Sequence, residues 1–423
     1  MVRLKYTCQV NPAPPRIPDD REVSFVPMEA VSERGGISTE QTRLAGSVRQ
    51  GYTGFIDGDI VVAKITPCFE NGKGSIVTGM INGVGYGTTE LHVLRCTRAD
   101  RRWLFYVTQS REFMGFGEGS MYGAGGQKRV PPEFVRNFKA HTPAVPTQIA
   151  TAAFLDRKTA AIDALIEKKQ KLLDLLAEKR AALINRAVTK GLDPSVPMKD
   201  SGIPSIGEIP AHWQTLQLRR LLRRIEQGWS PQCDSNPVLG SEWGVLKAGC
   251  TAGGVFNGDQ NKVLPPGLSP RPSLRVLAGD IVVSRASGSP EIIGSAALVG
   301  REERRLLLSD KLFRLHLDQG MAIPAFVVRA LGGRSARAQI ENAMSGAEGL
   351  ANNLPQARLK EVVVACPPLD EQSDLATSLD NRLSHISTAE RLLQLSVTGL
   401  SEYRQALITA AVTGQLDISE EAA

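Results

Sequence analysis

Two stretches of the sequence, half a chain apart, follow one pattern. Residues 154–193 read FLDRKTAAIDALIEKKQKLLDLLAEKRAALINRAVTKGLD, and residues 378–417 read SLDNRLSHISTAERLLQLSVTGLSEYRQALITAAVTGQLD. They align without a gap at an offset of 224 residues, as from Asp156 to Asp380. Both begin with Leu-Asp after one residue, and both end on Ala-Val-Thr-x-x-Leu-Asp. Solenoid repeats have periods of roughly 20 to 50 residues, so this spacing indicates a duplicated domain.

The duplication extends upstream of these stretches. Residues 130–148 match residues 354–372 at the same offset, and further upstream the offset falls to 221, where GDIVVAK (58–64) matches GDIVVSR (279–285). Gly-Asp followed by β-branched residues is typical of a turn that leads into a short buried strand. Each half of the chain is therefore predicted to contain a mixed module in which short strands dominate.

The duplicated stretches themselves predict long helices, because their apolar residues recur at three- and four-residue spacing. Each would be a helix of about 35 residues, or about 50 Å long. Neither apolar stripe can stay in water, so we expect the two helices to pack antiparallel and to hold the modules apart. The residues predicted to form this packing are Ile162, Leu165, Leu172, Leu176, Leu183, Ile386, Leu393, Leu400, Tyr403 and Leu407.

These patterns predict an α+β protein with an internal duplication and pseudo-two-fold symmetry. Two mixed, strand-rich domains are joined by two long antiparallel, coiled-coil-like helices. The predicted boundaries are a first domain at 1–142, a first long helix at 143–190, a connector at 191–212, a second domain at 213–366, a second long helix at 367–416 and a C-terminal tail at 417–423. Gly191 is predicted to cap the first helix.

Composition excludes some classes of function. No apolar run approaches the roughly 18 residues that a membrane helix needs, so we expect a cytoplasmic protein without membrane contact. Six scattered cysteines form no C-x-x-C pair, and we expect no metal site. The net charge of +6 permits nucleic-acid binding without requiring it.

Catalytic motifs are incomplete in this sequence. The nearest match to the phosphate loop G-x-x-x-x-G-K-[ST] has Pro67 at its first glycine and Gly74 at its hydroxyl position. The five histidines lie far apart and form no H-E-x-x-H motif. Asp59 and Asp280 are interpreted as turn residues. The chain is therefore predicted to bind rather than to catalyse.

Six segments, in a fixed order and partly duplicated, carry a resemblance to a known family. They are GDIVVAKITPCFENGKG (58–74), TTELHVL (88–94), GGQKRVP (125–131), FLDRKTAAIDALIEKK (154–169), LLAEKRAALINRAVTKGLDP (175–194) and KDSGIPSIGEIPAHW (199–213). In these segments the chain resembles the DNA-specificity subunit of type I restriction-modification systems.

The resemblance implies two target-recognition domains, each reading one half of a bipartite, asymmetric site in double-stranded DNA. It implies that the long helices set the spacing and dock partners, namely two methyltransferase subunits and restriction subunits. It also implies that this chain has no catalytic residue and holds no cofactor or metal. S-adenosylmethionine, ATP and Mg would be bound by the partner subunits.

Candidate DNA contacts follow the duplicated strand. Lys64 and Arg285 stand at equivalent positions, and each precedes a hydroxyl residue by two, an arrangement suited to phosphate or base-edge contact. The predicted DNA-binding residues are Lys64, Thr66, Lys73, Gln127, Lys128, Arg129, Arg285, Ser287, Asn352 and Asn353. The alternative for each is an ordinary solvated side chain.

Two further alternatives stay open at this stage. The basic run on the first helix, formed by Lys168, Lys169, Lys171, Lys179 and Arg180, is either a solvated face or a contact with DNA or a partner. The whole chain is either a specificity subunit or a DNA-free structural scaffold that binds proteins through its duplicated helices. A steep dependence of DNA binding on salt would separate the last two.

Overall fold

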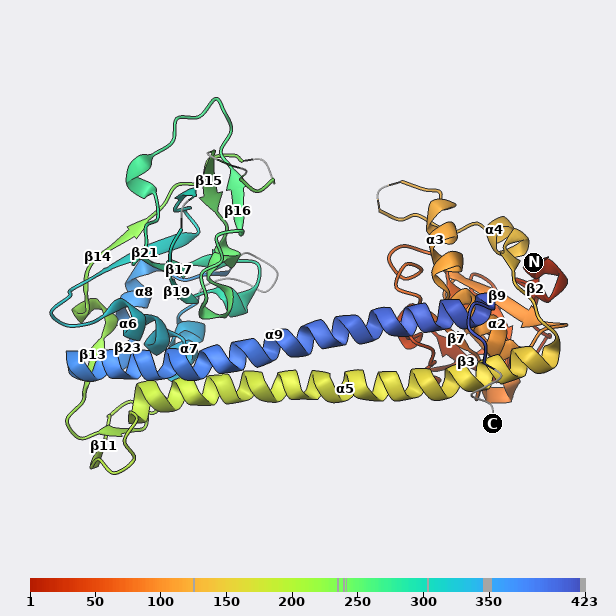
Figure 1. Cartoon of the computed structure of the whole chain (residues 1–423), viewed down its shortest axis with the longest axis horizontal. Coiled ribbons are helices and arrows are strands. Elements are labelled where there is room, and N and C mark those ends of the chain that lie inside the picture. Colours follow the sequence, from red (N-terminus) through yellow and green to blue (C-terminus); the bar gives the residue numbers. More distant parts are fainter. Residues whose placement is uncertain are drawn as a thin grey trace. The chain divides into compact units, whose positions relative to one another are not determined.

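The computed structural model describes residues 1–124, 126–233, 236–238, 240, 242–302, 304–344 and 352–418 (Figure 1). The chain divides into two compact units. The first unit comprises Met1–Lys171 and Leu393–Ala423, and the second unit comprises Leu172–Leu392. Each unit thus contains one half of each long helix, α5 (Val145–Lys190) and α9 (Leu369–Thr413). No helix in the described ranges is long and apolar enough to cross a membrane.

In the described part of the first unit, two four-stranded sheets form the framework. One has the order β2 (Cys8–Val10), β9 (Leu91–Cys96), β6 (Ile60–Ala63), β7 (Gly74–Ile76), with all neighbours antiparallel. The other has the order β4 (Thr42–Leu44), β3 (Glu22–Val26), β8 (Val84–Gly87), β5 (Thr53–Ile56), with β3 parallel to β8.

Among the described residues, the second unit repeats the antiparallel sheet of the first unit and three strands of its other sheet. Its four-stranded sheet has the order β14 (Leu222–Gln227), β21 (Leu312–Leu317), β17 (Ile281–Ser284), β19 (Ala296–Leu298). A second sheet has the order β16 (Asn261–Val263), β15 (Trp243–Leu246), β20 (Arg305–Leu307), with β15 parallel to β20. The two Gly-Asp-Ile-Val-Val segments lead into β6 and β17, which are inner strands at the same place in their sheets. The predicted strands are confirmed.

Short helices and strand pairs complete each unit. The helices are α1 (Ala45–Val48), α2 (Arg101–Thr108), α3 (Arg111–Gly119) and α4 (Pro132–Asn137) in the first unit, and α6 (Pro324–Leu331), α7 (Arg334–Ala343) and α8 (Gln356–Glu361) in the second. The paired strands are β1 (Val2–Arg3) with β10 (Lys139–Ala140), β11 (Met198–Asp200) with β12 (Glu208–Pro210), β13 (Gln214–Gln217) with β23 (Val363–Cys366), and β18 (Ala286–Ser287) with β22 (Asn352–Asn353). The β11–β12 pair lies in the predicted connector.

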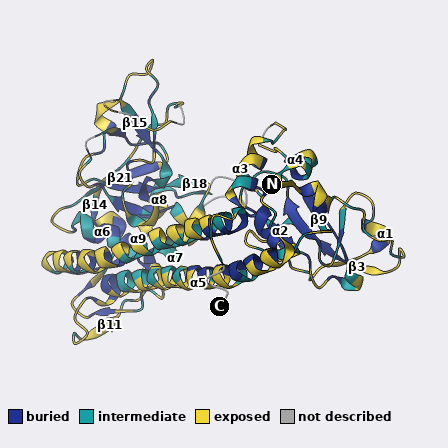
Figure 2. Ribbon diagram, turned by 45° about the vertical axis from the view of Figure 1, so that its right-hand side comes forward, coloured by how far each residue is buried: buried dark blue, intermediate teal, exposed yellow. Residues whose placement is uncertain are grey.

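The long helices pair antiparallel, because the beginning of each lies in the same unit as the end of the other (Figure 1). In the first unit, Ile162 and Ile166 of α5 share one hydrophobic core with Leu407 of α9. In the second, Ala187 of α5 shares a core with Leu379 of α9. Figure 2 shows this burial along one side of each helix. The predicted α+β class, with antiparallel long helices, is confirmed.

Both helices are longer than the roughly 35 residues that the repeated pattern alone indicates, at 46 residues for α5 and 45 for α9, and both lie within the predicted ranges 143–190 and 367–416. The additional length lies mainly upstream of the duplicated stretch, where Pro146 occupies the first turn of α5 and therefore breaks no intrahelical hydrogen bond. At the other end, Gly191 has a φ of 73° and donates its N–H to the Ala187 carbonyl at 3.2 Å. The predicted glycine cap is confirmed.

Three of the predicted packing residues are wrong. Leu165, Leu172 and Tyr403 are 43%, 49% and 58% exposed, whereas Ile166, the next residue after Leu165, is 6% exposed. Beside Tyr403, Arg404 takes the buried position. The apolar stripe of each long helix repeats every seven residues, as in a coiled coil. A residue that faces away from the partner helix is therefore followed, seven positions later, by another residue that faces away. Leu165 and Leu172 are such a pair.

The other predicted packing residues lie on the stripe. Ile162, Ile386 and Leu407 are buried. Those partly buried are Leu176 and Leu183 against the core of the second unit, Leu400 against that of the first, and Leu393.

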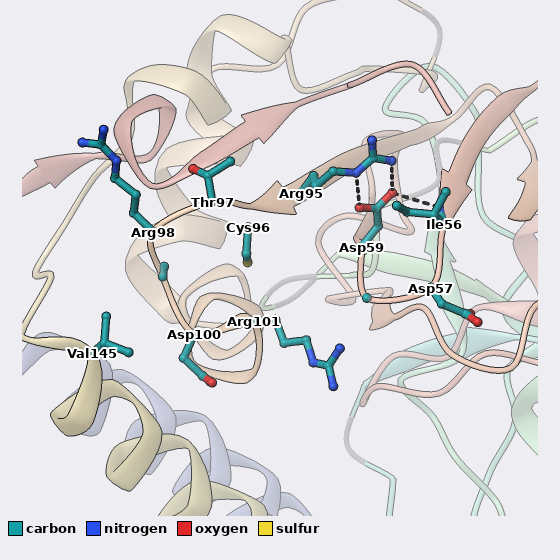
Figure 3. Close-up of a pocket in the computed structure, with 12 residues that line it drawn as sticks. Ile56, Asp57, Asp59, Arg95, Cys96, Thr97, Arg98, Asp100, Arg101 and Val145 are labelled. Carbon is teal, nitrogen blue, oxygen red and sulfur yellow. Dashed lines mark hydrogen bonds and ion pairs between the residues drawn. The ribbon is translucent and has the colours of Figure 1, made fainter. Parts of the chain in front are cut away.

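The predicted turn aspartates also have the expected role. Asp59 Oδ2 accepts a hydrogen bond from the Ile56 N–H at 2.9 Å, and Asp280 Oδ2 accepts one from the Leu277 N–H at the same distance. Asp59 is in addition held by Arg95, whose Nε and Nη2 lie 2.8 and 2.7 Å from its two oxygens (Figure 3). Both carboxylates fix the turn before an inner strand, which confirms the interpretation.

The corrected position of the stripe can be tested with two adjacent residues. Ile166→Ala should lower the free energy of unfolding of the first unit by about 2 to 4 kcal/mol, because it leaves a cavity in the core. Leu165→Ala should change it by less than about 0.5 kcal/mol, because that side chain already contacts water. Native-state hydrogen exchange in the first unit measures both. Equal losses, or a larger loss for Leu165→Ala, would contradict the assignment.

Candidate functional site

The predicted residues of the first unit gather where β6 ends. The Lys64 N–H donates to the Glu90 carbonyl at 2.9 Å, and the Lys64 carbonyl accepts from the Val130 N–H at 2.8 Å. Lys73 lies beside them, because its carbonyl accepts from the Ala63 N–H at 2.9 Å. The end of β6 at Lys64, which we call the strand-exit site of the first unit, is thus fixed on both sides by segments distant in sequence. The strand-exit site of the second unit is the corresponding end of β17 at Arg285.

Thr66 holds the loop that contains Gly126, Gln127 and Lys128 against the end of β6. Its hydroxyl donates to the Gly126 carbonyl at 2.6 Å and accepts from the Lys128 N–H at 3.1 Å. The Thr66 N–H in turn donates to the Lys128 carbonyl at 3.0 Å. Gln127 and Lys128 are exposed at the surface of this loop, whereas Gly125 lies outside the described residues. Thr66 therefore positions two exposed side chains of the loop.

Arg129 is engaged in an ion pair. Its Nε and Nη2 donate to the two carboxylate oxygens of Glu90 at 2.9 and 3.0 Å, and this hydrogen-bonded pair raises the pKa of Arg129. Its Nη1 also donates to the Gln127 carbonyl at 3.3 Å. Arg129 thus ties the loop to the residue before β9 and presents only part of its guanidinium to the surroundings.

Two residues that the sequence reasoning missed belong to this site. Tyr122 is 61% exposed and pairs with Arg129 through hydrogen bonds in both directions between their backbones. His92 is buried beneath the loop, with Nε2 donating to the Val130 carbonyl at 2.9 Å and Nδ1 accepting from Asn11 at 3.2 Å. An aromatic residue in a glycine-rich loop is a sequence signal that could have identified Tyr122 as part of the site. No such signal in the sequence marks His92.

In the second unit the same backbone arrangement recurs. The Arg285 N–H donates to the Lys311 carbonyl at 2.9 Å, and the Arg285 carbonyl accepts from the Leu354 N–H at 2.7 Å. The adjoining strands β18 and β22 pair Ser287 with Asn352. The structure therefore brings together the predicted residues of this unit as well. Residues 345–351, which precede Asn352, lie outside the described residues.

The Arg285 side chain contacts another predicted site residue. Its Nη2 donates to Asn353 Oδ1 at 2.8 Å, and its Nη1 donates to the Asp310 carbonyl at 3.2 Å. The guanidinium carbon lies 5.5 Å from the centre of the Phe313 ring. Arg285 is therefore oriented from three sides.

The two units differ in charge at one corresponding position. Glu90 and Lys311 make the same backbone hydrogen bond to the strand-exit residue, Lys64 or Arg285. In the first unit this position carries a carboxylate that pairs with Arg129, and in the second it carries an ammonium group. The backbone frame is shared, and the side chains that it presents are different.

Two members of the basic run on α5, Lys171 and Arg180, form ion pairs within the protein. Lys171 forms an ion pair with Glu167 at 2.7 Å, and Arg180 contacts Glu390 at 3.5 Å. Lys169 is half-buried on the packing stripe. Lys168 and Lys179 are exposed. These contacts favour the interpretation of a largely solvated helix face.

Each unit also has a cavity beside its turn aspartate. That of the first unit has a volume of about 620 Å³ and is lined by Asp59, Arg95, Arg98 and Arg101, among others (Figure 3). Asp280 lines a cavity of about 400 Å³ in the second unit. Within the described ranges, no group of three or more His, Cys, Asp or Glu residues is placed to hold a metal ion.

The chain is similar in sequence to several curated proteins. It is 28% identical over 458 residues to the type I restriction enzyme EcoEI specificity subunit of Escherichia coli, covering 90% of this chain and 77% of that protein. It is 43% identical over 137 residues to the type I restriction enzyme EcoAI specificity subunit of Escherichia coli, covering 32% of this chain and 23% of that protein. No protein-family model matches the chain.

A solved chain from work on complex assembly and conformational transition of the type I R-M system has the same fold. It aligns with a TM-score of 0.65 at 18% identity, covering 98% of this chain and 97% of that one. Over most of its length the chain is thus similar to a type I restriction enzyme specificity subunit, and it has the fold of a chain from a type I R-M system. In this chain, the two strand-exit sites occupy corresponding positions in the two units.

The role of Thr66 can be tested at the loop itself. Thr66→Val removes the hydroxyl that joins Gly126 to Lys128, so hydrogen exchange in residues 122–129 should become at least about tenfold faster. Thr66→Ser keeps the hydroxyl and should preserve protection. Unchanged exchange in Thr66→Val would show that the loop is held by other contacts.

A second test concerns His92. Burial lowers its pKa to about 4, and the charges of Lys64 and Arg136 act in the same direction. In the unfolded chain, the imidazole takes up a proton near the ordinary histidine pKa of about 6.5. Because the unfolded form binds this proton first, the folded form loses stability as the pH falls from about 6.5 to about 4. NMR titration, with His92→Gln to assign the resonance, should give a midpoint near 4. A midpoint near 6.5 would contradict the buried, neutral imidazole.

Proposed function

We propose that this chain selects the DNA sequence on which a type I restriction-modification complex acts. Each unit would read one half of a bipartite, asymmetric site in double-stranded DNA, and the chain itself would carry out no chemical step. The observation that carries this proposal is the strand-exit site, which recurs on the same backbone frame in both units with different side chains.

Such an arrangement suits the recognition of two unlike half-sites. Base pairs are distinguished by the donors and acceptors on their edges in the major groove. The first unit presents Lys64 with the Arg129 and Glu90 pair, and the second presents Arg285 with Asn353. In the first unit, the exposed side chains of Gln127 and Lys128 would contact bases or phosphates. Different side chains on one frame would therefore prefer different sequences.

The partners follow from the duplicated architecture. Each unit includes a half of α5 packed with a half of α9, so the chain offers two related surfaces, and related surfaces can bind two copies of one partner. We propose two methyltransferase subunits as these copies, together with restriction subunits, acting on DNA in the cytoplasm. S-adenosylmethionine, ATP and Mg would be held by those partners.

The competing hypothesis of a DNA-free scaffold makes an opposite prediction for DNA binding. We would reconstitute the chain with methyltransferase subunits from the same genome and measure the affinity for duplex DNA at several salt concentrations. Phosphate contacts release counterions, so the logarithm of the affinity should fall linearly with the logarithm of the salt concentration, with a slope of several. A complex that assembles but has no salt-dependent DNA affinity would support the scaffold instead.

The two strand-exit cations give a sharper test of half-site recognition. Once the recognised site is known, Lys64→Ala should reduce discrimination at one half-site and Arg285→Ala at the other, each by about 1 to 3 kcal/mol. Affinities for duplexes altered in one half-site at a time measure this. Lys171→Ala, which affects an ion pair on the helix surface, is the control. If both variants discriminate as wild type does, these cations do not read the half-sites.

A further inference from the structure

A cavity beside the strand-exit site of the second unit has a strongly basic lining. Its volume is about 350 Å³, and the polar residues that line it include Lys247, Lys262, Lys311, Ser230, Ser287 and Ser309. We propose that this cavity binds a backbone phosphate of the DNA and anchors the second unit independently of base sequence. The inference rests on the proposed function and assigns one ligand group to part of that surface.

The three lysines come from separate elements and converge through strand pairing. Lys262 lies on β16 in register with Val245 of β15. Lys247 follows β15 directly, and its N–H donates to the Gln260 carbonyl at 2.8 Å. Lys311 precedes β21 and receives the backbone hydrogen bond from Arg285. Lys247 and Lys262 thus come from one sheet and Lys311 from the other, and all three line the same cavity next to Arg285.

The charges of these lysines have no carboxylate partner among the residues that the structure describes. Within the described part of the chain, none of the three ammonium groups takes part in an ion pair. The nearest carboxylate in sequence, that of Asp310, accepts a hydrogen bond from the Ser230 hydroxyl, and the backbone N–H of Asp310 donates to Ser230 Oγ at 3.3 Å. Asp310 therefore offsets only part of the positive charge, and the cavity is suited to an anion.

A buried hydroxyl provides a second observation. Ser309 lines the cavity and is 3% exposed, and its Oγ has no hydrogen-bond partner among the described residues. Buried polar groups in native proteins nearly always have partners. An oxygen of a bound anion would accept this hydrogen bond after rotation of the hydroxyl.

The donor set favours a phosphate over a base edge. Lysine ammonium groups are compact charges with rotatable donors, which suit the oxygens of a phosphate at any angle, whereas base readout prefers a planar, bidentate group such as arginine. In the first unit, the position of Lys311 is taken by Glu90. In the first unit, the negative charge of Glu90 would oppose phosphate binding at this position. We therefore assign the phosphate site to the second unit alone.

The test uses the complex reconstituted with methyltransferase subunits. Lys247→Ala, Lys262→Ala and Lys311→Ala should each weaken DNA binding, and the triple variant should reduce the slope of log affinity against log salt by about 1, because one phosphate contact is lost. The loss should be equal on a duplex with the recognised site and on one with that site scrambled. Lys179→Ala, on the exposed face of α5, should leave the slope unchanged.

Methylphosphonate substitution in the DNA gives an independent readout, which begins with the wild-type protein. Neutralising one phosphate at a time in the second half-site should weaken wild-type binding at one position, and that substitution should have no effect on the triple variant. A triple variant that binds DNA with the wild-type salt slope would overturn the inference. So would a loss confined to the recognised sequence, or sensitivity to inorganic phosphate without sensitivity to methylphosphonate. A wild-type complex that binds no DNA would instead refute the proposed function.

Discussion

Neither long helix can leave its apolar stripe in water, and this constraint shapes both units. In the first unit, Ile162 of α5 and Leu407 of α9 share a core with Trp103 of α2. In the second, Ala187 of α5 and Leu379 of α9 share a core with Phe326 of α6. The helices therefore act as part of each domain's core. Segments from distant parts of the chain must meet before either core is complete.

On these cores the chain builds the same surface twice with different chemistry. Main-chain hydrogen bonds at Lys64 and Arg285 are alike, because they depend on strand order and register. The side chains around them differ, because backbone pairing does not constrain them. Substitution of Glu90 for Lys311 reverses the local charge without disturbing a strand. A frame of this kind tolerates changes of specificity, since the residues that select the ligand carry little of the packing.

Much of this architecture was predictable from local patterns. The turn aspartates, the inner strands and the Gly191 cap depend on neighbouring residues and were identified. The position of the helix stripe was not, because Leu165 and Leu172 also satisfy three- and four-residue spacing, and only the partner helix decides which leucines are covered. At the site, the clustering was predicted from the duplication.

The side-chain pairs at the site could not be predicted. Arg285 and Asn353 are 68 residues apart, and Arg129 and Glu90 are 39 apart, so their contacts follow from strand register. The central claim, that the chain selects a DNA sequence, is tested most directly by sequencing methylated bases across a genome. A strain that carries the chain with its methyltransferase should show adenine methylation at one bipartite, asymmetric motif, which should vanish when the chain is deleted. Methylation at the same sites without the chain, or at none with it, would contradict the account.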